Sequence, residues 1–263
     1  RTSESGFDLP TAWAALDQTT IERTAAQHSN QLFNRISGAW VSRGNGQESL
    51  VSLRSPVLSG AGSCGAFMTA QDGISMRSPG FCNVNQLFDA NLLQAGRVEV
   101  LKGPGAVVFG SNALHGIINV VTRSVDSTPN QVRVEAGSRD YYRVSASGAV
   151  ASGIALSAQT SRYGGYQDAS GYDQQKATLR IDQEWGNWRV DGALEGSQLD
   201  LRRRSGSKGK PKPRSLSKRL VWQSSYRPNT RLGRFVRADN PPFLAQQQYD
   251  LLATLFTLAG HRD

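Results

Sequence analysis

The first quarter of the chain begins with a helical pattern of apolar and polar positions. Within residues 16–36, apolar side chains recur every three or four positions, so that they gather on roughly one side of a helix. Thr19 or Thr20 would cap its start and Gly38 would end it. The pattern therefore predicts one amphipathic helix in this region.

Short apolar segments follow and have the composition of buried strands. One of them contains the pair Asp72-Gly73, which favours a tight hairpin turn. A second helix is predicted over residues 84–95, directly before an alternating strand. This mixture predicts a compact α+β unit that ends near Arg123. Its strands are expected at residues 39–43, 49–54, 66–76, 97–103 and 117–122.

The pattern changes after Pro129, where apolar and polar residues alternate with a period of two. Tight turns and one longer polar loop, residues 164–174, separate the alternating segments. Strands of about ten residues with short turns at one end and longer loops at the other are typical of outer-membrane barrels. A soluble β-sandwich would show the same alternation, so periodicity leaves both architectures open. The five predicted strands cover residues 131–137, 141–150, 153–163, 176–185 and 187–199.

Composition narrows the class of protein further. The chain has 263 residues and 38% hydrophobic content, which is enough for a core. No apolar run reaches the roughly 18 residues that a membrane helix needs. Because the first residue is not Met and no signal peptide is recognisable, we expect a processed or excised segment.

The net charge of +9 is distributed unevenly. Residues 1–200 hold 16 basic and 18 acidic residues, whereas residues 201–263 hold 14 and 3. Nucleic-acid binding through residues 202–219 is disfavoured, because no aromatic residue is interleaved with the basic ones. Alternation also stops after Leu199, so we expect residues 201–263 to be an atypical basic tail from a frame-shifted or truncated gene rather than native barrel sequence.

A glycine-rich segment, RVEVLKGPGAVVFGSNALHGIINVVTR, covers residues 97–123. It looks at first like a phosphate-binding loop, but Ser111 and Asn112 follow Gly110 where that motif requires Lys and Ser or Thr. The dinucleotide-binding spacing of glycines is missing too. Gly103-Pro104-Gly105 is instead a turn signal, and we interpret these glycines as structural.

Candidate chemistry is sparse in the rest of the sequence. The three histidines, His28, His115 and His261, lie far apart and belong to no catalytic motif, so we expect no enzyme, no metal site and no cofactor. Cys64 and Cys82 share one glycine-rich segment at a spacing that does not suit a metal. A disulfide is favoured, with two buried thiols as the alternative. A disulfide would indicate a compartment outside the reducing cytosol.

Residues 97–123 resemble the signature that closes the plug domain of TonB-dependent outer-membrane receptors. The matching parts are Arg-Val-Glu-Val-Leu-Lys-Gly-Pro, then Phe-Gly-Ser-Asn-Ala-Leu-His-Gly, then Ile-Ile-Asn-Val-Val-Thr. Upstream segments such as LFNRISGAWVSR and AQDGISM are similar to the family as well, and the resemblance covers roughly residues 14–200. The signature residues are Arg97, Glu99, Gly103, Pro104, Gly110, Gly116 and Asn119.

The resemblance implies an α+β plug domain followed by antiparallel β-strands of an incomplete outer-membrane β-barrel. The expected limits are 1–123 for the plug, 124–200 for the first barrel strands and 201–263 for the tail. Such a receptor lies in the Gram-negative outer membrane and takes up a scarce nutrient, most often a ferric siderophore or similar metal chelate. Its partners would be periplasmic TonB, outer-membrane lipid and the small ligand, with no nucleic acid. The alternative is a secreted soluble β-rich binding module.

The resemblance also assigns roles to individual residues. Arg54 and Lys102 stand where the family places basic plug residues that pair with glutamates of the barrel wall, and a Cys64–Cys82 disulfide would stiffen a loop facing the ligand. Two departures are visible: Ser55 replaces the usual glycine, and no TonB box is recognisable before Asp8. The residues after Arg123 are too few for a barrel of about 22 strands, so we expect an incomplete, non-transporting form.

Overall fold

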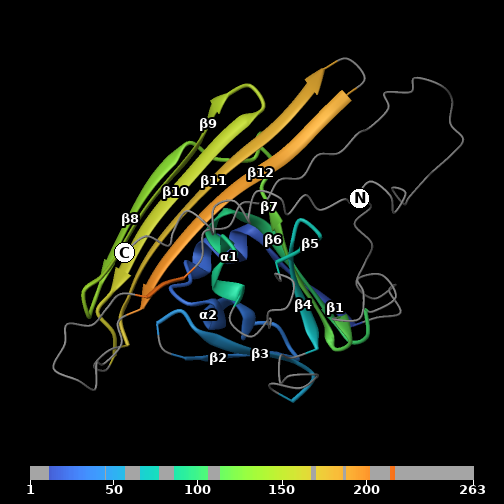
Figure 1. Cartoon of the computed structure of the whole chain (residues 1–263), viewed down its shortest axis with the longest axis vertical. Coiled ribbons are helices and arrows are strands. Elements are labelled where there is room, and N and C mark those ends of the chain that lie inside the picture. The colour runs from blue at the N-terminus through green and yellow to red at the C-terminus, as the bar shows by residue number, and fades with distance from the viewer. Residues whose placement is uncertain are drawn as a thin grey trace, which may run out of the picture.

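The computed structural model describes most of the first 201 residues and one short strand beyond them. It consists of a compact unit, here called the plug (described residues 12–123), and a curved sheet of long strands, here called the wall (β8 to β13) (Figure 1). The plug lies against one face of the wall. The described ranges are 12–44, 46–56, 66–76, 86–105, 113–166, 170–185, 188–201 and 214–216.

The single helix predicted over residues 16–36 is wrong. The segment instead forms the end of strand β1 (Ala12–Asp17), helix α1 (Gln18–Thr24) and helix α2 (Ser29–Phe33). The helix breaks at Ala25, whose φ of 43° is left-handed and cannot continue an α-helix. The apolar spacing runs across this break, and for that reason the sequence pattern did not reveal it.

The helix cap also differs from the prediction. Asp17, not Thr19 or Thr20, caps α1, because its side chain accepts a hydrogen bond from the backbone N–H of Thr20 at 2.8 Å. This hydrogen bond lowers the pKa of Asp17. Asp17 is at once the last residue of β1 and the first turn's acceptor, so strand and helix join without a loop.

The plug sheet has five strands in the order β1-β6-β7-β4-β5. Neighbours are antiparallel except β4 and β7, which run parallel. The predicted hairpin at Asp72-Gly73 is confirmed: both residues have positive φ, of 51° and 83°, as a tight two-residue turn requires. The additional strands are β4 (Phe67–Gln71), β5 (Ile74–Ser75), β6 (Ala95–Lys102) and β7 (Gly116–Thr122).

The remaining plug elements are short. Strands β2 (Ala39–Arg43) and β3 (Ser49–Leu53) form where strands were predicted, and they pair with each other. The helix predicted over residues 84–95 is wrong, because the described residues from 86 to 95 form two 3-10 turns instead, η2 (Gln86–Phe88) and η3 (Leu92–Gln94). Asn91 separates them with non-helical φ and ψ of −83° and 74°.

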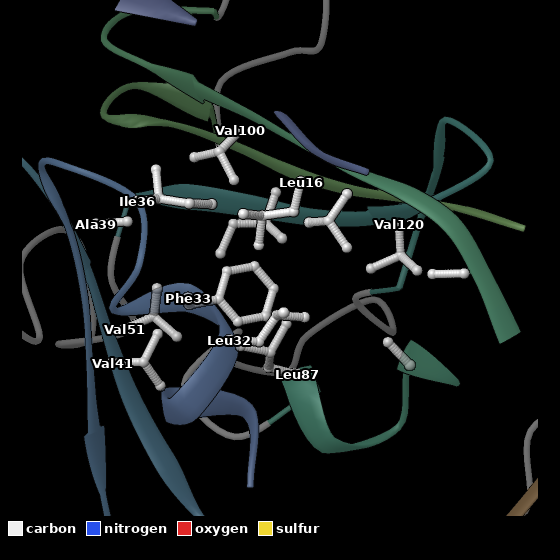
Figure 2. Packing of buried hydrophobic residues seen from close by; sticks show 14 of the residues in the cluster. Leu16, Leu32, Phe33, Ile36, Ala39, Val41, Val51, Leu87, Val100 and Val120 are labelled. Carbon is white, nitrogen blue, oxygen red and sulfur yellow. The ribbon is translucent and has the colours of Figure 1, made fainter. Parts of the chain in front are cut away.

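The plug core is formed by apolar side chains from its helices and both of its sheets (Figure 2). The ring of Phe33 is completely buried near the middle of this cluster, and α2 supplies Leu32 beside it. No helix in the described parts of the chain is long and apolar enough to cross a membrane. The labelled core residues are Leu16, Leu32, Phe33, Ile36, Ala39, Val41, Val51, Leu87, Val100 and Val120.

The wall contains all five strands predicted from the period of two, and consecutive strands are antiparallel. One boundary differs: β11 begins at Tyr172, so the loop before it is shorter than predicted. Tyr172 stands opposite Tyr163 of β10, with ring centroids 5.9 Å apart. The strands are β8 (Gln131–Gly137), β9 (Tyr141–Ala151), β10 (Ile154–Tyr163), β11 (Tyr172–Trp185), β12 (Trp188–Leu201) and the short β13 (Arg214–Leu216).

The two faces of the wall differ in polarity, and the apolar one points away from the plug. The side chains of Val132, Val134 and Val150 are 74%, 70% and 63% exposed. Polar residues such as Ser161 and Thr178 alternate with the apolar row and are buried. A soluble sandwich would bury its apolar face, whereas an outer-membrane barrel turns it toward lipid. This orientation favours the barrel over the sandwich.

Candidate functional site at the plug–wall interface

Three signature residues, Arg97, Glu99 and Asn119, form a hydrogen-bonded network inside the plug sheet. The Glu99 carboxylate accepts from Arg97 Nε at 2.7 Å and from Asn119 Nδ2 at 3.0 Å, across the β6–β7 pairing. Asn119 Oδ1 accepts from the backbone N–H of Gly73 at 2.9 Å. The network thereby joins strands β6 and β7 to the Asp72-Gly73 turn, which is a structural role.

The signature glycines allow tight bends. Gly103 and Gly116 have φ of 129° and 143°, a region that favours glycine. A Cβ at position 116 would lie 2.1 Å from the carbonyl oxygen of Leu101 on the neighbouring strand. Pro104 is exposed beside this bend, and Gly110 lies outside the described residues.

Arg143 of β9 binds the plug at the end of helix α1. Its guanidinium donates to the carbonyl oxygens of Ala25 and Ala26, both at 2.8 Å, and to the Glu135 carboxylate of β8 at 2.5 Å. The last carbonyls of a helix have no partner within the helix and carry partial negative charge. A buried cation of the wall therefore satisfies the carbonyl groups that follow a plug helix.

Lys176 of β11 binds a second plug turn in the same way. Its ammonium donates to the carbonyl oxygen of Ala90 at 2.7 Å and to that of Phe88, and the residue is only 8% exposed. On β12, Ser197 donates to the Asp89 carboxylate at 2.9 Å. The turn over residues 88–90 is thus held by two wall strands.

Further along β11, Arg180 forms an ion pair with a plug carboxylate. Its Nη1 lies 3.1 Å from Asp72 Oδ2, and it also donates to the Thr122 hydroxyl. Asp72 in turn accepts from the backbone N–H of Thr122 at 2.9 Å. Arg180 therefore attaches both the β4–β5 turn and the end of β7 to the wall.

One strand supplies most of these contacts. Every second residue of β11 from 172 to 180 bonds to the plug, because alternate side chains of a strand share one face. Between the cations, Thr178 accepts from the Asn91 amide at 3.0 Å. The row could have been identified from its polar alternation, but the sequence does not show what it contacts. Its members are Tyr172, Gln174, Lys176, Thr178 and Arg180.

Residues 5–117 match the family model described as the TonB-dependent Receptor Plug Domain. Relatives and solved structures with matching folds agree with this assignment. Residues 5–117 therefore form a plug domain of the TonB-dependent receptor type. The proteins that the chain resembles are outer-membrane receptors of Gram-negative bacteria, and the exposed apolar face of the wall agrees with this location.

The chain spans about a quarter to a third of the length of the proteins that it matches. The vitamin B12 transporter BtuB of Vibrio cholerae serotype O1 is 28% identical over 181 residues, which is 67% of this chain and 28% of that protein. The ferric yersiniabactin uptake receptor FyuA of Yersinia pestis gives a TM-score of 0.57 at 21% identity, covering 76% of this chain and 35% of its own. The pyoverdine receptor FpvA of Pseudomonas aeruginosa gives 0.59 at 16% identity, covering 74% and 28%. These structures share the fold.

Arg54 and Lys102 form no hydrogen bond or ion pair with the described residues of the wall. Lys102 donates to the carbonyl oxygen of Ser37 inside the plug at 2.9 Å, and Arg54 is exposed. Burial and the neighbouring Arg54 charge both lower the pKa of Lys102. Their pairing with wall glutamates stays a prediction.

Cys64 and Cys82 lie outside the described residues, so their disulfide also stays a prediction. We expect mass spectrometry of alkylated, unreduced protein to find both thiols blocked from alkylation. The closed loop would stabilise the plug by about 3 kcal/mol on the chain-entropy model. Two alkylated cysteines would contradict the prediction, and reduction before alkylation provides the control.

The plug carries one buried histidine that makes its stability depend on pH. His28 is 1% exposed and caps α2: its Nδ1 accepts from the Asn30 N–H at 3.1 Å, and its Nε2 lies 3.1 Å from the Glu48 carbonyl oxygen. Only the neutral ring with its proton on Nε2 satisfies both groups. Burial, and secondarily the Arg43 charge, lower the pKa of His28 below its ordinary value of 6.5.

Stability should therefore fall in acid through His28. Its contribution is fully present above the unfolded pKa of 6.5 and decreases as the pH falls from there through the folded pKa, because the unfolded chain takes up the proton first. We expect His28→Asn, which keeps a capping side chain, to lose less stability than the parent between about pH 7.5 and about pH 5.5. Thermal unfolding in detergent micelles measures this, and equal losses would contradict it.

Proposed function

We propose that this chain supplies the plug and first wall strands of a receptor that takes up a scarce nutrient across the outer membrane. The observation that supports it most is the polar character of the plug–wall interface. Arg143, Lys176 and Arg180 hold the plug through backbone carbonyls and one ion pair. Buried polar contacts fix a geometry more than they add stability, so a plug held in this way is positioned but remains displaceable.

The ligand is proposed from what similar proteins are named for. The printed names include vitamin B12, ferric yersiniabactin and pyoverdine, which suggests a metal complex, and a ferric siderophore or a similar chelate is our proposal. Periplasmic TonB would supply the energy by pulling on the plug, and lipid would cover the apolar row of the wall. The limits 1–123 for the plug and 124–200 for the wall strands are proposed with it.

Uptake in cells tests this function. We would compare a bacterium that carries the gene, a deletion strain and a strain without TonB, using radiolabelled ferric siderophores and cyanocobalamin as probes. If further strands complete the barrel, one probe is expected to enter the parent and to fail to enter both other strains. The non-transporting form expected from the sequence would show no uptake that depends on the gene or on TonB. Uptake of every probe at the parental rate in the deletion strain would contradict the proposal.

The secreted soluble module is the less favoured function. A soluble module would leave the exposed side chains of Val132, Val134 and Val150 in water. Soluble proteins rarely expose such an apolar patch unless it is an interaction surface. Partition of the protein into detergent rather than the aqueous phase would separate the two possibilities.

A further inference from the structure

A cavity lies between the plug and the wall, close to β10. Its volume open to water is about 40 Å³, room for about two or three water molecules or a small anion. The plug lines it with the turn before α2 and with residues 87–93, and the wall lines it from β9, β10 and β11. Its polar side chains include His28, Gln47, Arg143, Gln159, Gln174 and Lys176.

The lining is positively charged. Arg143 and Lys176 both border the cavity, and no aspartate or glutamate is among the residues that line it. The carboxylate that pairs with Arg143, Glu135, is outside the lining. Two cations in a mostly buried space create a potential that attracts negative charge.

Two lining residues have polar atoms without a partner. Arg143 and Ser29 are only 4% and 5% exposed. Arg143 Nε and Ser29 Oγ nevertheless make no hydrogen bond. Buried donors without acceptors are costly, and native structures rarely leave them so. Neither atom has surface open to the cavity as it stands, so an acceptor in the cavity would remove this cost only when the two side chains turn toward it. A negatively charged acceptor would form stronger hydrogen bonds than a neutral one.

The cavity also adjoins β10, whose polar inward side chains form few bonds to the plug; Tyr163 near its end stacks under the plug's Arg43. Among the described residues, β11 bonds the plug from five successive inward positions, whereas no side-chain hydrogen bond to the plug comes from the inward residues of β10, Ser157, Gln159 and Ser161. A solute entering here would separate few existing contacts.

We propose that this cavity is a binding site for a small anion, such as a carboxylate group, between the plug and the wall. The anion accepts hydrogen bonds from Arg143 Nε and Ser29 Oγ and is attracted by the Lys176 ammonium. It competes with the carbonyls of Ala26 and Ala90 for the two cations, which links its binding to the attachment of the plug. The site does not depend on which nutrient the receptor carries.

Alkylation by two reagents of similar size tests the site in the purified chain in detergent. Iodoacetate is anionic and iodoacetamide is neutral. Ser161→Cys places a thiol in the cavity, Thr178→Cys is a control of matched burial outside it (5% and 6% exposed), and Ser138→Cys is an exposed reference. Peptide-level mass spectrometry reads each position separately from Cys64 and Cys82.

We expect the iodoacetate-to-iodoacetamide rate ratio at Ser161→Cys to exceed that at Ser138→Cys by about tenfold, because two cations line the cavity and the carboxylates near them, Glu135, Asp89 and Glu195, lie outside the lining. Formate should slow iodoacetate at Ser161→Cys and leave Thr178→Cys unaffected. Lys176→Met should reduce the ratio. Equal ratios at positions 161 and 138, measured with Arg143 and Lys176 both present, would overturn the proposal and indicate a cavity that holds only water. This outcome does not depend on whether the Lys176→Met variant folds.

Discussion

Replacing Gly116 by alanine is expected to destroy the stable fold of the plug. The new Cβ would lie 2.1 Å from the Leu101 carbonyl oxygen, which belongs to the paired strand β6 and cannot move away without breaking the sheet. The φ of 143° is also strained for alanine. We expect a loss of about 4 kcal/mol or more in the free energy of unfolding, the range reserved for gross steric conflict.

Urea unfolding in detergent micelles, followed by near-ultraviolet circular dichroism, measures this loss. Gly196→Ala is the matched control, because that glycine also lies in a strand but has nothing within 4 Å of its Cβ position. The control should be neutral or slightly stabilising, by up to about 1 kcal/mol. A Gly116→Ala protein as stable as the control would show that β6 and β7 can separate at this point without cost.

Arg143→Met is expected to weaken the attachment of the plug to the wall. The change leaves the carbonyls of Ala25 and Ala26 without their donor and leaves Glu135 without its cation. Removing one partner of a buried ion pair typically costs about 3 to 5 kcal/mol, because the other charge stays buried and unpaired. We expect earlier thermal unfolding and faster hydrogen exchange in α1.

Arg162→Met provides the comparison. Arg162 lies on the neighbouring strand β10 and is 3.7 Å from Asp173, but both side chains are about 40% exposed. Exposed pairs contribute at most about 1 kcal/mol, so this variant should unfold close to the parent. Equal effects of the two substitutions would mean that Arg143 acts only as surface charge and that the plug is held elsewhere.

The interface differs in polarity from the pairing that the family resemblance implied. That expectation placed cations on the plug, at Arg54 and Lys102, and carboxylates on the wall. In the described part of the chain the wall supplies the cations, and the plug supplies backbone carbonyls and the carboxylates of Asp72 and Asp89. One wall carboxylate, Glu195, accepts from the plug's Gln71. Carbonyl acceptors depend on the shape of the plug rather than on its side chains, so the Arg143 and Lys176 contacts require the turns at residues 25–26 and 88–90.

Local sequence patterns determined most of the regular structure. Alternation with a period of two predicted five of the six described wall strands, because a strand exposes its two faces in turn. The pair Asp72-Gly73 predicted its turn because both residues tolerate positive φ. The signature of residues 97–123 identified the family, since its glycines and its Arg97, Glu99 and Asn119 network serve one particular sheet.

Only the tertiary structure decided which face of the wall meets lipid and how the first helix ends. Alternation is symmetric, so it cannot say which row is inside until the plug is seen to cover the polar one. The break at Ala25 is held by Arg143, 118 residues later in the chain, so no local pattern contains it. The same is true of the Lys176 and Arg180 contacts: the sequence provides the charged side chains, but their partners are set by packing between segments that are distant in the chain.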